Sequence, residues 1–335
     1  MNKTFVLVTG ANGFIGSQLV RTLLHRGFRV RAAVHQLRSE NYHLQNPMLE
    51  WIKIDISDRS SLTDAFKRVD HVYHFAAKVN DKLSRQELHR VNVQGTRNIW
   101  EMASQTGVKK ALYCSTTAVY GLLCGSQNMI DEHTTTRAVE AYGKSKLEGE
   151  KIVREISSTR NLDFIIMRPT AVFGPGDHTH FGKQLRTAAF SKLLLSAGFK
   201  NKKFSYVHVE DVASAAIHLM QYAVTSDPVY NIAVDQPISY DEAFAAYLRV
   251  LDHPGFEYLK LRWLGKLSAI VDQMPEISGW LSSRKKLPFA FKIWKPGFDM
   301  TYSSKKLLAT SFQFHWTNFE DILSSCLNEA SLIPL

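Results

Sequence analysis

A tyrosine and a lysine stand four positions apart in the stretch VEAYGKSKLEGE, residues 139–150. Residues at this spacing meet on one face of a helix, which would bring Tyr142 next to Lys146. A free tyrosine has a pKa of about 10 and is a poor base at neutral pH, but a neighbouring ammonium group favours the phenolate. The spacing is therefore compatible with a proton-transfer pair, but by itself it does not distinguish such a pair from a solvated helix face.

The start of the chain predicts a unit that binds phosphate. The run TFVLV predicts a buried strand, a helical pattern of apolar residues follows, and RVRAAV predicts a second strand. Gly10, Gly13 and Gly16 lie between the first strand and the helix. Glycines there let the backbone approach a pyrophosphate, whose charge is met by free N–H groups at the helix start. We therefore predict a dinucleotide site, the alternative being a tight turn with close helix packing.

Further motifs follow in an order that resembles one enzyme family. The spacing G-x-x-G-x-x-G after Thr9 resembles the extended short-chain dehydrogenase/reductase family, also called the NAD(P)-dependent epimerase/dehydratase superfamily. The resemblance continues through NVQGT, ALYCSTTAVYG, the Tyr142 and Lys146 pair, MRPTAVFGPGD and YVHVEDVASAA, and it covers residues 1 to about 235. In appearance it is strongest to the 3β-hydroxysteroid dehydrogenase and dihydroflavonol reductase branch.

This resemblance implies an α/β fold with a doubly wound parallel sheet (Rossmann fold) and a smaller, mostly helical C-terminal substrate domain. We expect the dinucleotide-binding domain to comprise residues 1–170 plus about 204–235. The substrate-binding domain would comprise about 171–203 plus 236–335.

The resemblance implies that Tyr142 and Lys146 are the proton-transfer pair, and it also implies a role for each other matching residue. Thr116, four residues before the tyrosine of VYG, is expected to hold the substrate oxygen within reach of Tyr142, and Lys146 to bind the nicotinamide ribose. Asn92 is expected to hold the local backbone and a water near the site. Asp55 and Ile56 would contact the adenine ring. The full set of expected cofactor-binding residues is Gly10, Asn12, Gly13, Phe14, Ile15, Gly16, His35, Arg38, Asp55, Ile56, Ala76, Ala77, Tyr142, Lys146, Pro169 and Val172.

The residues after the second predicted strand bear on the choice of cofactor. An acidic residue there would accept hydrogen bonds from the ribose 2′-OH and repel a 2′-phosphate. This chain has His35 and Gln36 at that place, and Arg38 follows. The local positive charge predicts NADP(H) rather than NAD(H).

Two departures from the nucleotide-sugar enzymes favour an apolar substrate. Phe204 stands where many of those enzymes have an arginine for the diphosphate, although Lys202 and Lys203 are adjacent. Thr117 and Ala118 stand where the sugar 4,6-dehydratases have two acids. We therefore expect an NAD(P)-dependent dehydrogenase or reductase that transfers a hydride between the cofactor and a secondary alcohol or ketone of a steroid-, flavonoid- or lipid-like substrate. The alternatives are an NDP-sugar epimerase and a non-catalytic cofactor-sensing protein.

The composition is that of an ordinary globular protein, with 45% hydrophobic and 21% charged residues among 335. The formal net charge is +10, but the basic residues are scattered and an anionic cofactor also favours a positive surface, so we expect no nucleic-acid partner. The three cysteines are too irregular for a disulfide framework or a zinc site, and we expect no metal. The apolar runs are too short for a signal peptide or a transmembrane helix, which predicts a cytoplasmic protein.

Two surfaces remain as candidates for contact with partners. The helices expected at 87–105 and 140–157 would form the family's four-helix interface, which predicts a homodimer. In residues 256–297, apolar side chains recur at helical spacing from Leu259 to Val271, with basic residues largely on the other side. This segment is either an ordinary substrate-domain helix or an apolar lid that touches an anionic membrane.

Overall fold

The computed structural model describes residues 4–37, 46–79, 83–121, 129–177, 193–196, 202–223, 226–251, 257–260 and 299–328. Arg38 lies outside these residues, as does most of the segment 256–297.

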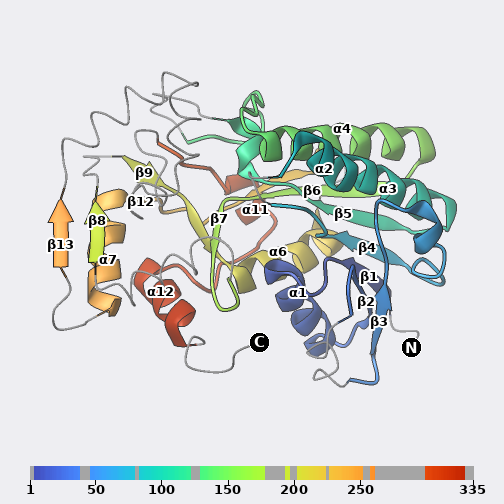
Figure 1. Ribbon diagram of the computed structural model, residues 1–335, viewed down its shortest axis with the longest axis horizontal. Coiled ribbons are helices and arrows are strands. Elements are labelled where there is room, and N and C mark those ends of the chain that lie inside the picture. Colours follow the sequence, from blue (N-terminus) through green and yellow to red (C-terminus); the bar gives the residue numbers. More distant parts are fainter. Residues whose placement is uncertain are drawn as a thin grey trace.

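A seven-stranded parallel sheet forms the centre of the molecule (Figure 1). Its spatial order is β11-β6-β5-β4-β1-β2-β3. The strands are β1 (Phe5–Thr9), β2 (Arg29–Val34), β3 (Leu49–Lys53), β4 (His71–His74), β5 (Lys110–Cys114), β6 (Asp163–Pro169) and β11 (Val229–Ile232). The chain runs outward from β1 to β3 and then resumes on the other side of β1 with β4. This reversal is the topological switch point at which doubly wound folds bind their ligands. The predicted doubly wound parallel sheet is confirmed.

Helices cover both faces of the sheet (Figure 1). On one face lie α1 (Phe14–His25) and α6 (Val209–Tyr222), which pack against each other. On the other lie α2 (Arg85–Leu88), α3 (Gly95–Gln105) and α4 (Ala141–Arg160). A π-helical stretch, His89–Gln94, joins α2 to α3, and two short 3₁₀ helices cover Arg59–Leu62 and Thr117–Tyr120.

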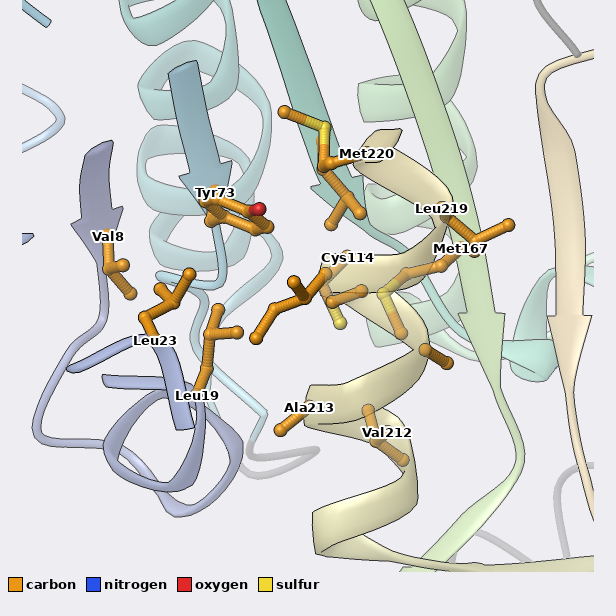
Figure 2. Packing of buried hydrophobic residues seen from close by; sticks show 14 of the residues in the cluster. Val8, Leu19, Leu23, Tyr73, Cys114, Met167, Val212, Ala213, Leu219 and Met220 are labelled. Atoms are coloured by element: carbon orange, nitrogen blue, oxygen red, sulfur yellow. The ribbon is translucent and has the colours of Figure 1, made fainter. Parts of the chain in front are cut away.

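The central strands β1, β5 and β6 are mostly apolar and buried, as expected where helices cover both faces, whereas the edge strand β3 is half-buried or exposed. In β1, Val6 and Val8 belong to the core beneath α1 and α6, whereas Leu7 belongs to the core beneath α3 and α4. The same alternation separates Cys114, on the α6 side, from Tyr113, on the α4 side. Figure 2 shows the first of these cores, in which the side chains of α1 and α6 meet those of the strands.

The remaining elements lie beside one end of the sheet (Figure 1). Three strand pairs are described here: β7 (Ala171–Phe173) with β10 (Tyr206–His208), β9 (Lys203–Phe204) with β12 (Ile238–Ser239), and β8 (Leu193–Ser196) with β13 (Glu257–Lys260). The described helices after residue 235 are α7 (Tyr240–Leu251), α11 (Lys305–Leu308) and α12 (Phe319–Asn328). Residues of α7 and α12 pack with those of β7, β9 and β10 in a core rich in aromatic residues, among them Phe173, Phe204, Tyr240 and Phe319, whereas α11 packs against β11. The predicted domain boundaries stay a prediction.

The helical interpretation of residues 256–297 is wrong where the structure describes them. Leu259 and Lys260 lie in β13, which pairs in parallel with β8. The other residues of that pattern lie outside the described ranges. None of the helices in the described part of the chain combines the length and apolar character needed to cross a bilayer.

Candidate functional site

The turn between β1 and α1 is built from close backbone contacts. Gly10 has a φ of +69°, and a Cβ there would lie 2.7 Å from the backbone nitrogen of Ala76. A Cβ on Gly16 would lie 2.1 Å from the carbonyl oxygen of Gly10. Both positions therefore require glycine for packing alone, and this packing brings the turn against the end of β4.

The start of α1 is open to an anionic group. Gly13 is the N-cap residue, no side chain caps the helix, and its first turn contains no acidic residue. Asn12 and Gly13 are exposed, and Phe14 and Ile15 are half-buried. The first N–H groups of a helix lack intrahelical partners and favour an anion. The turn therefore fits a phosphate group of a dinucleotide.

The ends of β2 and β3 form the side expected to hold the adenosine. His35 directly follows β2 and is exposed. Asp55 accepts hydrogen bonds from the backbone N–H and the hydroxyl of Ser57, at 2.9 and 2.7 Å. Burial alone would raise the pKa of Asp55, but these hydrogen bonds hold it below its ordinary value, with help from nearby His35 and Arg90. One carboxylate oxygen of Asp55 is therefore occupied by hydrogen bonds within its own turn. The neighbouring Ile56 is buried.

A chain of hydrogen bonds runs from the glycine-rich turn into the π-helical stretch. The backbone N–H of Ala76 donates to the Thr9 hydroxyl at 3.2 Å, and that hydroxyl lies 2.7 Å from Nδ1 of His74. The other ring nitrogen of His74 lies 3.2 Å from the Thr96 hydroxyl, which donates to the carbonyl oxygen of Asn92 at 2.6 Å. The ends of β1 and β4 are thereby fixed to the helix that carries Asn92.

The side chain of Asn92 continues this chain to α4. Its Oδ1 accepts from the N–H of Lys78 at 2.8 Å, and its Nδ2 donates to the Lys78 carbonyl at 3.0 Å. Nδ2 also donates to the Ser145 hydroxyl at 2.9 Å, and this hydroxyl donates to the Tyr142 carbonyl at 2.7 Å. Asn92 therefore ties the loop after Ala76 and Ala77, both half-buried, to the first turns of α4. We expected Asn92 to hold local backbone, and this geometry fits that expectation.

Two glycines let α4 lie directly on the end of β5. A Cβ on Gly143 would lie 2.8 Å from the carbonyl oxygen of Ala118, and a Cβ on Gly149 would lie 2.2 Å from the hydroxyl oxygen of Tyr113. The contact at Gly143 places the first turn of α4 against the turn that Thr116 begins. Thr116 is half-buried, and its hydroxyl accepts from the N–H of Ala118 at 3.2 Å, which leaves the O–H itself to donate.

The two residues of the predicted proton-transfer pair differ in how far their side chains are exposed. Tyr142 is half-buried, whereas Lys146 is 2% exposed. Burial lowers the pKa of Lys146 to about 8, against the opposing influence of Cys114 and Glu150. A buried ammonium one helical turn from a phenol favours the phenolate, which is the arrangement that acid–base chemistry at a substrate oxygen needs.

Pro169 and Val172, the last two of the expected cofactor-binding residues, lie at the end of β6 and in β7. Pro169 is buried at the end of β6, paired with Ile232. Val172 is half-buried in β7, paired with Val207.

A buried ion pair beneath the site has no counterpart in the sequence predictions. Arg168 donates to both carboxylate oxygens of Glu150, at 2.9 and 2.6 Å, and to the Tyr120 hydroxyl at 2.8 Å. The Ser115 hydroxyl donates to the same carboxylate. One signal was present in the sequence, since Glu150 stands four residues after Lys146 on the same helix face, but its partner on β6 is set only by the fold.

Known proteins resemble this chain along most of its length. It is 30% identical over 307 residues to the "3 beta-hydroxysteroid dehydrogenase/Delta 5-->4-isomerase" of Mycobacterium tuberculosis, covering 87% of this chain and 79% of the relative. It is 30% identical over 249 residues to the "3-beta-hydroxysteroid dehydrogenase" of Mycolicibacterium neoaurum, covering 70% and 66%. Among the first four curated relatives, the matched stretch spans only 52, 66, 67 and 60% of their own lengths.

The fold has solved counterparts as well. The UDP-glucose 4-epimerase of Thermus thermophilus, in complex with NAD, superposes with a TM-score of 0.75 at 22% identity, covering 98% of this chain and 100% of that one. At this identity the likeness shows the fold alone. Residues 6–233, which contain the glycine-rich turn, Thr116 and the Tyr142 and Lys146 pair, match one family by sequence. The chain belongs to the NAD dependent epimerase/dehydratase family.

Proposed function

We propose that this protein is an NAD(P)-dependent oxidoreductase that acts on a secondary alcohol or ketone of a largely apolar molecule. The observation that carries the proposal is the contact of α4 with the end of β5 at Gly143. It sets Tyr142 beside the turn of Thr116, with the buried Lys146 one helical turn further along.

Each of these side chains has a task in moving a proton at the substrate oxygen. The Thr116 hydroxyl donates to that oxygen and orients it. Tyr142 gives up or takes the proton, and the Lys146 ammonium favours its phenolate form. A bound nicotinamide cofactor would supply or accept the hydride. Its phosphates would be held by Gly10, Gly13 and the open start of α1.

NADP(H) is the proposed form of the cofactor. In the described chain, β2 is followed by His35, Gln36 and Leu37, which are exposed and include no acid. A carboxylate at this place would repel a 2′-phosphate. Arg38, which also favours NADP(H), lies outside the described residues.

The proposed substrate class rests on what lies at the diphosphate position of nucleotide-sugar enzymes. Phe204 is 3% exposed and packs against Tyr240, with ring centroids 5.0 Å apart. Lys202 is engaged by Asp299, its Nζ 2.9 Å from the carboxylate. An aromatic core residue and a paired lysine offer little to a diphosphate, which supports an apolar substrate over an NDP-sugar.

NADPH oxidation with a panel of ketones tests the proposal. Tyr142→Phe should reduce turnover by at least ~100-fold while NADPH binding persists, because the proton is lost and the other cofactor contacts remain. Tyr222→Phe, at an exposed tyrosine on α6, is the matched control and should keep full activity. A Tyr142→Phe protein that retains more than about a tenth of the rate would exclude Tyr142 as acid or base. Tight binding of UDP would favour the NDP-sugar alternative.

We also propose that the protein forms a homodimer through α3 and α4. Its proposed location is the cytoplasm. The exposed residues of α4 are all polar or charged: Lys144, Glu148, Lys151, Arg154, Glu155, Ser158, Thr159 and Arg160. Charge pairs rather than apolar burial would hold such an interface, and salt screens exposed charges. Light scattering at low and high salt should therefore show a dimer that dissociates as salt rises, and a monomer at both would refute it.

A further inference from the structure

Lys146 places a charged group inside the protein, and no carboxylate in the described part of the chain forms an ion pair with it. The side chain is 2% exposed, and its Nζ lies 4.2 Å from the ring centroid of Tyr113. The nearby carboxylate of Glu150 accepts hydrogen bonds from Nε and Nη2 of Arg168. Burial raises the pKa of the Cys114 thiol to about 11, which keeps it neutral. The aromatic face is therefore the group that meets the ammonium directly.

The Tyr113 ring is fixed from several sides. His74 stacks on it, with centroids 5.8 Å apart and an interplanar angle of 26°. Trp100 meets it edge-on, at 5.8 Å and 88°, and its indole N–H donates to the Ser157 hydroxyl of α4 at 3.1 Å. The absence of a side chain at Gly149 lets the Tyr113 hydroxyl reach the backbone of α4. All three aromatic residues are at most 1% exposed, so the ring has a single position relative to the lysine.

Tyr113, His74 and Trp100 form an aromatic platform in which the imidazole of His74 is neutral. The Thr96 hydroxyl donates to the Asn92 carbonyl, so it accepts from Nε2–H of His74. In a neutral imidazole, Nδ1 then accepts from the Thr9 hydroxyl. The neutral form therefore satisfies both bonds. Burial, together with the charge of Lys146, also lowers the pKa of His74 to about 3.

We propose that the Tyr113 ring, held by His74 and Trp100, is a positioning element that carries the Lys146 ammonium and keeps it charged inside the fold. A cation over an aromatic face gains most when both are removed from water, as here. The proposal rests on the proposed function in one respect: in that function, the positive charge of Lys146 favours the phenolate form of Tyr142.

The test measures the charge of Lys146 directly, in the protein without added substrate. Lysine is labelled with ¹³C and ¹⁵N, the Nζ signal of Lys146 is assigned by its loss in Lys146→Arg, and its titration midpoint is followed by NMR. Position 113 carries tyrosine, phenylalanine, or phenylalanine with one to four ring fluorines, which weaken the ring's negative face with little change of size. The same series at Tyr73, a buried tyrosine that belongs to the core on the other face of the sheet, is the matched control.

We expect Tyr113→Phe to leave the midpoint of Lys146 unchanged. Successive fluorines should lower it stepwise, by about one unit or more in total, which is a tenfold change in the proton dissociation constant. The Tyr73 series should leave it unchanged. A midpoint that is constant across the position-113 series, or that moves equally in the Tyr73 series, would overturn the proposal. If the stepwise fall occurs in a protein that reduces no ketone, the platform stands and the proposed function fails.

Discussion

The ion pair between Glu150 and Arg168 gives the most direct test of the packing beneath the site. The two side chains are 3% and 4% exposed. Two arms of the guanidinium group bind the carboxylate, and the third donates to the Tyr120 hydroxyl. Each of the three guanidinium nitrogens of Arg168 therefore donates to a partner inside the protein. Glu150 is the partner that carries the opposite charge.

Glu150→Gln keeps the size of the side chain and one acceptor oxygen but removes the negative charge. The guanidinium group stays protonated in proteins, so its charge would remain buried among neutral groups. Removing one partner of a buried ion pair costs about 3–5 kcal/mol. Against a typical total of about 5–15 kcal/mol, this loss in the free energy of unfolding is large.

Urea unfolding followed by circular dichroism would measure the effect. The double variant Glu150→Gln with Arg168→Met removes both charges, so it should be more stable than Glu150→Gln alone by about 2 kcal/mol or more. Glu320→Gln, at an exposed pair with Arg249, is the control and should cost less than about 1 kcal/mol. A cost below about 1 kcal/mol for Glu150→Gln, or a double variant as unstable as the sum of the single ones, would refute the reasoning.

Three further predictions concern neighbouring groups. Burial lowers the pKa of Lys146 from 10.5 to about 8, so the unfolded chain binds more protons between these values; stability should rise with pH across this window in thermal melts, and Lys146→Met should flatten the rise. Gly149→Ala would set a Cβ 2.2 Å from the Tyr113 hydroxyl oxygen; we expect a loss of about 1–3 kcal/mol in urea unfolding, part of which Tyr113→Phe restores. Burial lowers the pKa of His208 from 6.5 to about 4, so the unfolding free energy should fall as the pH drops from 6.5 to 4, and less so in His208→Asn.

The succession of strands and helices along the chain was predictable because its signals are local, whereas the doubly wound sheet was implied by the family resemblance. A strand buried on both faces appears as an apolar run, and the glycines after β1 mark the turn into α1. The spacing of Tyr142 and Lys146 is likewise local, since one helix turn separates them. The segment at 257–260 shows where this reasoning fails. Four residues are too few for their periodicity to distinguish a strand from a helix, and the pairing of this segment with β8 was not visible from its own residues.

The supporting groups of the site were not predictable for a related reason. Arg168 and Glu150 are 18 residues apart and lie on different elements, and only the packing of α4 on β5 and β6 joins them. Tyr113 reads in the sequence as one more apolar strand residue. Its place under Lys146 depends on which face of β5 it occupies and on Gly149, which allows α4 to approach.

The hydrogen-bonded chain from Thr9 to Tyr142 explains why the turn and the proton-transfer pair can work as one unit. Thr9 precedes the turn expected to hold phosphate, and through His74 and Thr96 it is connected to Asn92. Asn92 in turn holds the first turns of α4 through Ser145. Each bond in this chain is buried or partly buried, and losing a partner there leaves an unsatisfied polar group at a cost of about 1–3 kcal/mol. A shift of the turn would therefore strain the helix start, so the two parts of the site keep one relative position.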